Sequence, residues 1–269
     1  MPTISILTIN MEYCIRNKPL IKRKSDLISQ QKPDIIFIQE SNISGIKLDN
    51  YVYIKFPHLA KIELMDIYLR KDCNWLKDSI QEITTSLCFT PRSCKIITLK
   101  HKTTNQKIKI ANIHLCGGRY DENDKIGAML KGSLKDIRKR KNEILEILVK
   151  THKVDIVAGD FNSDLICYLN NGTLQNDHLS FLKKIAPKKT YKIYQEWNMA
   201  PFNYLHNNNY ILATFIKKNI NTLPTSIYNT HPDAIWYKQK LFTQKDYKII
   251  KLIRHNLSDH DGIYAKFQL

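Results

Sequence analysis

The sequence predicts a single α/β domain built around large sheets. Short runs of isoleucine, valine, phenylalanine and tyrosine, which suit buried strands, recur along all 269 residues, whereas helix-like periodicity is confined to a few segments. We find no internal repeat and no linker-like stretch in the sequence. At roughly 150 residues per domain the length allows one or two domains, and strands that continue from end to end favour one domain over residues 1–269.

The N-terminal half begins with two strands that flank a helix. Residues 3–10 carry apolar side chains on both alternating faces, and residues 35–38 read Ile-Ile-Phe-Ile, so both strands are predicted to be buried on two sides. The helix spans residues 20–31 and ends before Pro33, because a residue that precedes proline disfavours helical geometry. Further strands are predicted near residues 52–56, 64–70, 80–90, 95–100 and 107–115.

The C-terminal half begins with the clearest helix, over residues 134–150. Ile137, Ile144 and Leu148 mark one face of it, and the basic run at residues 138–141 lies mostly on the other face. A second helix is expected near residues 179–185. Exposed loops are expected at residues 170–176 and 203–209. Strands are predicted at residues 154–158, 210–216, 233–237, 247–255 and 262–267.

The composition excludes several classes of protein. Apolar residues make up 43% of the chain and aromatic residues 10%, and both contents are far higher than those of a disordered chain. The sequence has no apolar run long enough to cross a bilayer and no signal-peptide pattern at its start, so we expect an intracellular protein, nuclear or cytoplasmic. The six cysteines form no C-x-x-C pair, which favours reduced thiols over a zinc site or disulfides.

The charge is strongly positive, with 42 lysines and arginines against 25 aspartates and glutamates. A net charge of +17 predicts a polyanionic partner: nucleic acid, a phosphoinositide or an anionic membrane. A lysine-rich surface that follows from an AT-biased genome is the alternative explanation. The large excess of basic over acidic residues favours the explanation that the protein binds a polyanion.

Polar residues follow the predicted strands repeatedly, at the position where loops carry functional sites on a rigid scaffold. Each one alone is more often a turn former or a solvated strand end. The fragments are Asn10, Gln39-Glu40, Asn112-Ile113-His114, Gly159-Asp160-Phe161-Asn162, Asp233 and Ser258-Asp259-His260.

Taken in this order, the fragments resemble the endonuclease/exonuclease/phosphatase superfamily, the metal-dependent phosphodiesterases related to DNase I. Gly-Asp-Phe-Asn at 159–162 and Ser-Asp-His at 258–260 are the most specific elements, and the resemblance extends from residue 8 to residue 260. It implies a four-layer α/β/β/α sandwich, with two packed mixed sheets flanked by helices. It also implies a catalytic site at one edge of that sandwich.

The resemblance implies a divalent cation, Mg²⁺ or alternatively Mn²⁺. Such hard cations prefer oxygen ligands and neutralise the charge that a phosphodiester develops in its transition state. Glu40 is the best ligand candidate, with Asn10 beside it and Asp259 binding directly or through water. Glu12 stands where many family members have aspartate, and it is a further candidate for the metal shell.

The resemblance also implies catalytic roles for five residues. Asp160 would orient or deprotonate the attacking water, and Asn162 would hold that water or a phosphate oxygen. His260 would donate to the phosphorus centre or act as acid/base, with Asp233 orienting its ring. His114 would supply a second imidazole on the phosphate.

The branch of the superfamily is less well specified. His114 stands where the exonuclease III type usually has tyrosine, which disfavours an abasic-site enzyme. Arg119, five residues later, resembles the 5′-tyrosyl-DNA phosphodiesterase branch and would clamp a substrate phosphate; a solvated loop cation is the alternative. Phe161 departs from that branch, which usually has threonine there.

The sequence therefore predicts a Mg²⁺-dependent phosphodiesterase acting on nucleic acid, with DNA favoured over RNA. It would be a nuclease or a DNA-end-processing repair enzyme. Basic segments such as residues 18–24 and 138–141 are suited to a phosphate backbone, although each is also compatible with a solvated surface. The alternatives are an inositol-phosphate or sphingomyelin phosphohydrolase of the same superfamily and a non-catalytic nucleic-acid-binding relic. No stable membrane association is expected.

Overall fold

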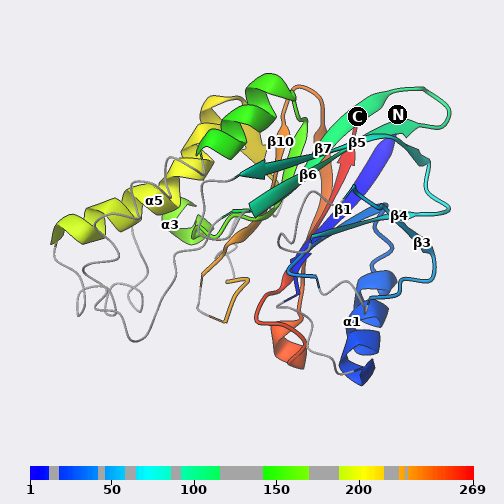
Figure 1. The fold of residues 1–269 in the computed structure, drawn as a ribbon, viewed down its shortest axis with the longest axis horizontal. Coiled ribbons are helices and arrows are strands. Elements are labelled where there is room, and N and C mark those ends of the chain that lie inside the picture. Colours follow the sequence, from blue (N-terminus) through cyan, green and yellow to red (C-terminus); the bar gives the residue numbers. More distant parts are fainter. Residues whose placement is uncertain are drawn as a thin grey trace.

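The computed structural model describes residues 1–11, 18–41, 46–57, 65–85, 92–115, 142–169, 188–214, 224–227 and 230–269. Two six-stranded sheets lie face to face at its centre, with helices on their outer sides (Figure 1). The two termini lie side by side, where Leu269 N donates to the Pro2 carbonyl at 3.0 Å. The strand that begins at Thr3 runs from there toward the opposite end of the sandwich.

The first sheet has the strand order β11-β12-β1-β2-β4-β3. The pair β1–β2 is parallel, and the other neighbouring pairs are antiparallel. Residues 4–10 of β1 and all of β2 are buried, as expected for strands covered on both faces. The strands are β1 (Thr3–Asn10), β2 (Ile35–Gln39), β3 (Tyr51–Tyr53), β4 (Asp66–Arg70), β11 (Thr243–Ile250) and β12 (Gly262–Gln268).

The second sheet has the order β5-β6-β7-β8-β10-β9. Its parallel pair is β7–β8, and it is therefore mixed in the same way as the first sheet. The strands are β5 (Trp75–Thr85), β6 (Arg92–His101), β7 (Lys107–His114), β8 (Ile156–Asp160), β9 (Tyr210–Leu212) and β10 (Asp233–Lys238).

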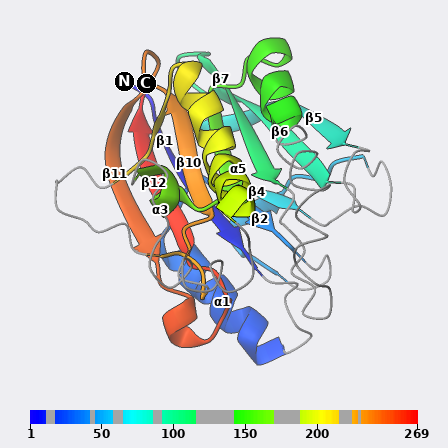
Figure 2. The ribbon, with the colours of Figure 1, turned by 90° about the vertical axis from the view of Figure 1, so that its left-hand side faces the viewer.

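Three apolar clusters hold the four layers together. The central cluster joins the facing sides of the two sheets, with Phe37 and Ile97 among its fully buried members. On the outer side of the first sheet, Ile28 of helix α1 (Lys18–Gln30) packs with strand residues. On the outer side of the second sheet, Leu148 and Phe202 pack with strand residues (Figure 2). These outer helices are residues 142–146, the π-helical turn Ile147–Thr151, α3 (Leu165–Leu169) and α5 (Lys188–Asn207).

The predicted fold class is confirmed, because the two stacked mixed sheets with outer helices form the expected sandwich. The predicted strands are present with shifted ends among the described residues. The predicted helix at 20–31 appears as α1. Of the helix predicted at 134–150, the described part begins at residue 142; the helix predicted at 179–185 and the loop at 170–176 lie outside the described residues.

Two local predictions are wrong. Residues 203–207 end helix α5 instead of forming a loop, because Phe202 and Leu205 are buried against the sheet at helical spacing. The strand predicted at 247–255 ends at Ile250. Beyond it, Asp261 Oδ1 accepts hydrogen bonds from the Leu252 and Ile253 amides and draws the backbone into the 3₁₀ turn Ile253–His255.

Among the residues that the structure describes, no helix is both long enough and apolar enough to cross a membrane.

Candidate active site

Strands from both sheets bring polar residues to one edge of the sandwich. In the first sheet, Asn10 pairs with Gln39 at the ends of β1 and β2, and Glu40 follows directly. In the second sheet, Asp160 at the end of β8 pairs with His114 on one side and with Asp233 on the other. Because the sheets lie face to face, these strand ends bring polar residues of both sheets together at one end of the sandwich.

The backbone at this edge is sharply turned. Glu40 and Asn162 have φ values of 52° and 47°, in the left-handed region that residues other than glycine seldom adopt. Gly159 has a φ of 146°, and a Cβ there would lie 1.9 Å from the Ile113 carbonyl oxygen. Only glycine therefore permits the close approach of β7 and β8 that places His114 next to Asp160.

The Asp160 carboxylate is almost completely enclosed by hydrogen-bonding partners. Its Oδ2 accepts from Asn10 Nδ2 at 2.9 Å and lies 3.4 Å from His114 Nε2, and its Oδ1 accepts from the Asn162 amide at 2.7 Å. Burial by itself would raise the pKa of Asp160. The charges of His114 and His260, together with these hydrogen bonds, outweigh burial and hold that pKa below its usual range.

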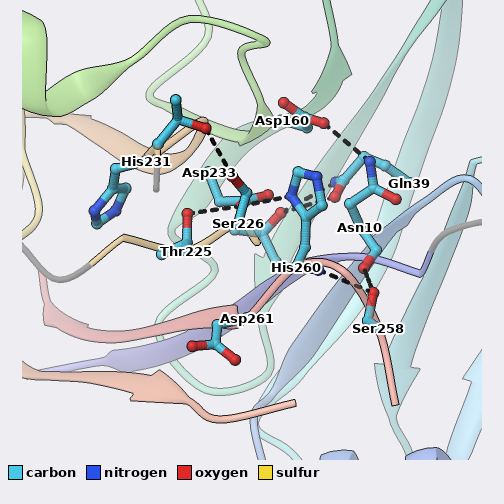
Figure 3. A network of polar contacts seen from close by, with 12 residues as sticks. Asn10, Gln39, Asp160, Thr225, Ser226, His231, Asp233, Ser258, His260 and Asp261 are labelled. Carbon is cyan, nitrogen blue, oxygen red and sulfur yellow. Dashed lines mark hydrogen bonds and ion pairs between the residues drawn. The ribbon is translucent and has the colours of Figure 1, made fainter. Parts of the chain in front are cut away.

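A buried histidine–aspartate pair faces Asp160 (Figure 3). His260 Nδ1 lies 2.9 Å from Asp233 Oδ2, which also accepts from Thr225 Oγ1 at 2.9 Å. Burial raises the pKa of Asp233 to about 6, although His260 opposes it. Burial would lower the pKa of His260, but Asp233 outweighs it and raises the value to about 10. At neutral pH the shared proton therefore resides on the imidazole.

His114 connects the two sheets through its ring. Its Nε2 lies 3.4 Å from Asp160 Oδ2 and 3.7 Å from Glu40 Oε1, and its side chain is buried. The Glu40 side chain keeps 19% of its surface exposed, more than His114, Asp160, Asp233 and His260. Glu40 is therefore more open than Asp160 and Asp233 to a ligand that arrives from solvent.

The donor set fits a hard divalent cation. Asp160, Asp233 and His260 each offer a ligand atom, and these atoms lie within 4.8 Å of one another, so this buried group could bind a metal ion that displaces the imidazole proton. Asp233 Oδ1 is buried and has no hydrogen-bond partner among the residues that the structure describes. Glu40 and Asn10 add oxygen atoms at the same edge, and oxygen ligands are what Mg²⁺ prefers.

The structure brings together most of the residues that the sequence singles out. Asn10, Glu40, His114, Asp160 and His260 meet through the contacts above. The Asn162 side-chain amide donates to the Leu115 carbonyl at 2.7 Å. Asp233 pairs with His260 Nδ1. Asp259 directly precedes His260, and its negative charge raises the pKa of that histidine. Glu12 and Arg119 lie outside the described residues.

Sequence reasoning gave no role to three further groups. Thr225 supplies a hydroxyl to Asp233 but belongs to no recognisable motif. Ser258 Oγ donates to the Asn10 carbonyl at 3.0 Å and accepts from the His260 amide at 3.2 Å, which ties the His260 turn to β1. Gln39 and Asn112 lie inside the motifs, yet their hydrogen bond crosses from one sheet to the other, which only the folded chain reveals.

No protein-family model matches this sequence, and no curated protein sequence matches it significantly. Solved structures do. Humanized D. rerio TDP2 is 16% identical with a TM-score of 0.65, and 99% of each chain is covered. D. rerio TDP2 with a single-stranded DNA product is 15% identical with a TM-score of 0.63 over 100% of both chains. An endonuclease/exonuclease/phosphatase from Bacteroides vulgatus is 14% identical with a TM-score of 0.65, also over 100% of both. The chain therefore has the DNase I-like fold of these proteins.

Proposed function

We propose that this protein is a Mg²⁺-dependent phosphodiesterase that acts on nucleic acid. The observation that carries the proposal is that an ionised carboxylate and a buried histidine–aspartate pair lie together at one end of the sandwich. The enclosed carboxylate of Asp160 lies against the buried His260–Asp233 pair, and Glu40 and Asp160 both approach the Nε2 atom of His114. An ionised base next to a protonated imidazole, beside oxygen donors, suits attack of water on a phosphodiester.

Glu40 and Asn10 are the residues proposed to hold the cation, with Asp259 and Glu12 completing the shell. When bound, Mg²⁺ would polarise the phosphoryl oxygen and neutralise charge on the leaving group. Asp160 would accept a hydrogen bond from the attacking water, since its lowered pKa keeps it ionised at neutral pH. Asn162 holds the turn that follows Asp160 through the Leu115 carbonyl.

His260 would donate to the phosphate through Nε2, because Nδ1 is engaged by Asp233. With a pKa of about 10 the imidazole keeps its proton at neutral pH, so it acts as a hydrogen-bond donor and positive charge rather than as a base. His114 would contact a second phosphate oxygen. Both imidazoles thus stabilise negative charge that increases in the transition state.

Nucleic acid is the favoured substrate. The net charge of +17 suits a polyanion, and one structural neighbour was solved with a single-stranded DNA product. Within nucleic acids, a DNA end that carries a 5′-phosphotyrosyl adduct is the specific candidate, with Arg119 clamping a phosphate. The DNA product in that structural neighbour is the reason to favour DNA over RNA.

The test is a substrate panel with purified protein in Mg²⁺. It comprises single- and double-stranded DNA, RNA, an abasic duplex, a 5′-phosphotyrosyl oligonucleotide, sphingomyelin and a phosphoinositide. EDTA and the Asp160→Asn variant serve as negative controls, and Mn²⁺ replaces Mg²⁺ in a parallel series. We expect cleavage of at least one nucleic acid, abolished by EDTA and restored by Mg²⁺.

The outcomes of the panel distinguish the specific candidate from the alternatives. Release of tyrosine without general degradation would make this a DNA-end repair enzyme. Turnover of the lipids alone would contradict the nucleic-acid assignment, and turnover that persists in EDTA would contradict the metal requirement. Binding of nucleic acid without any turnover, unchanged by Asp160→Asn, would make it a non-catalytic relic.

A further inference from the structure

The candidate site is divided between the two sheets, so its geometry depends on how the sheets are held against each other. Asn10 and Glu40 lie at strand ends of the first sheet, whereas His114 and Asp160 end strands of the second. The central cluster between the sheets is apolar, and apolar burial is non-directional. Directional contacts between the sheets therefore matter for the alignment of the two halves of the site.

Three buried polar side chains bridge the sheets directly behind the site. Gln39 Nε2 donates to Asn112 Oδ1 at 2.6 Å and lies 3.0 Å from Thr8 Oγ1. Asn112 Nδ2 in turn donates to the Ile38 and Asp66 carbonyls, both at 3.3 Å. All three side chains are fully buried. We call Thr8, Gln39 and Asn112 the inter-sheet bridge.

The bridge adjoins the residues proposed for catalysis. Gln39 immediately precedes Glu40, whose backbone turns in the left-handed region, so a shift of Gln39 moves Glu40 with it. Asn112 lies two residues before His114 on β7, and alternate residues of a strand share a face. The Gln39–Asn112 hydrogen bond thus fixes one residue beside Glu40 to one residue behind His114, across the gap between the sheets.

We propose that Gln39 and Asn112 are positioning residues whose hydrogen bond sets the separation of Glu40 on the first sheet from His114 and Asp160 on the second. The expected effect on turnover rests on the proposed function, whereas the expected effect on the distance between Glu40 and His114 does not. A bridge that only stabilised the fold would be replaceable by apolar side chains of similar size without loss of rate.

The experiment removes the bridge in two ways. Gln39→Met or Asn112→Leu alone removes the hydrogen bond between the sheets and leaves the partner amide buried with one hydrogen bond fewer, so each should lower both thermal stability and turnover. The triple variant Thr8→Val/Gln39→Met/Asn112→Leu removes all three polar side chains together, and joint removal of both partners of a hydrogen bond is often nearly neutral for stability. The Ile38 and Asp66 carbonyls still lose their Asn112 donor, so we expect stability to recover in part. We expect kcat to stay about tenfold or more below wild type, with KM little changed.

Two further variants make the comparison sharper. The exchange Gln39→Asn/Asn112→Gln keeps the summed length of the two amides, so it should recover turnover relative to Gln39→Asn alone. Ser5→Ala is the matched control, because Ser5 Oγ makes a buried hydrogen bond to Asp34 within the first sheet, away from the site. It should lower stability and leave kcat unchanged.

A triple variant that recovers both stability and kcat would overturn the proposal, as would single variants that fold and keep the wild-type kcat. A crystal structure of the triple variant gives a readout independent of activity: the distance from Glu40 Oε1 to His114 Nε2, 3.7 Å in the native chain, should change. An unchanged distance would contradict the inference. Wild-type protein that turns over nothing in the panel would refute the proposed function, while this distance would still test the bridge.

Discussion

The two ends of the β1–β2 pair both bury a carboxylate, but in opposite circumstances. Near the termini, Asp34 Oδ2 accepts from the Ser5 amide and hydroxyl and Oδ1 accepts from Arg70, all at 2.8 Å. At the other end, Asp160 and Asp233 are crowded around His260, and one oxygen of Asp233 has no hydrogen-bond partner within the described part of the chain. A satisfied carboxylate within one sheet stabilises the fold, whereas crowded ones at the junction of two sheets shift each other's pKa and are available for chemistry.

The largest expected effect breaks the reactive end. Asp160→Asn and His260→Ala should each lower kcat/KM by about a thousandfold or more, because the first removes the carboxylate proposed to act on the attacking water and the second removes the imidazole proposed to donate to the phosphate. Steady-state kinetics on the substrate found in the panel measures the loss, and circular dichroism shows that the variants fold. Turnover close to wild type in either folded variant would contradict the assigned roles.

The next effect breaks the structural end. Asp34→Ala removes the acceptor of the Ser5 amide and hydroxyl and one of the two carboxylates that pair with Arg70, and loss of one member of a mostly buried ion pair costs about 3 kcal/mol. Urea unfolding should show that loss, while kcat of the folded fraction stays within about twofold of wild type, since the site is at the other end. A large drop in kcat would show that the two ends are coupled.

A smaller effect sharpens the role of the hydroxyl on Asp233. Thr225→Val keeps the shape of the side chain but removes its donor to Asp233 Oδ2, so His260 is held by a less constrained carboxylate. We expect kcat to fall by about tenfold, which corresponds to one lost hydrogen bond to a charged group. Thr225→Ser keeps the hydroxyl and should retain most of the wild-type rate; equal losses in both variants would exclude the hydroxyl as the cause.

The smallest effect concerns a buried cation outside the site. Lys95 Nζ donates to the Met65 carbonyl and lies 5.0 Å from the centre of the Phe56 ring, and burial lowers its pKa despite the nearby Glu82 and Asp66. The folded state thus disfavours the ammonium. Lys95→Met should change the free energy of unfolding by only about 1 kcal/mol near neutral pH.

The pH dependence of that difference has a definite sign. A lysine whose pKa is lowered in the folded state costs stability below that pKa, and the cost disappears as the pH rises toward the ordinary value of 10.5. Wild type should therefore gain stability relative to Lys95→Met as the solution becomes alkaline. Urea midpoints of both proteins across that range measure it, and a constant difference would show that Lys95 is not strained by burial.

The motifs at strand ends made much of the site predictable, because they lie in sequence next to strands whose burial is plain from their composition. Asn10, Glu40, His114, Asp160 and His260 lie together where the two sheets meet, and their catalytic and metal-binding roles stay predictions. Thr225 could not be predicted, since its role depends on a turn that returns to Asp233. Helix α5 was missed because its asparagines and Pro201 suggest a loop, and only burial of Phe202 and Leu205 against the sheet favours the helix.

The antiparallel pairing of β1 with β12 has a consequence for how the molecule forms. Thr3 pairs with Gln268, so one edge of the first strand has no partner until residues near 268 have been synthesised. Contacts so distant in sequence slow folding, and an unpaired buried strand is prone to pair wrongly. The nascent chain should therefore depend on chaperones late into translation. Products that stop short of residue 262 should aggregate rather than accumulate as smaller folded proteins.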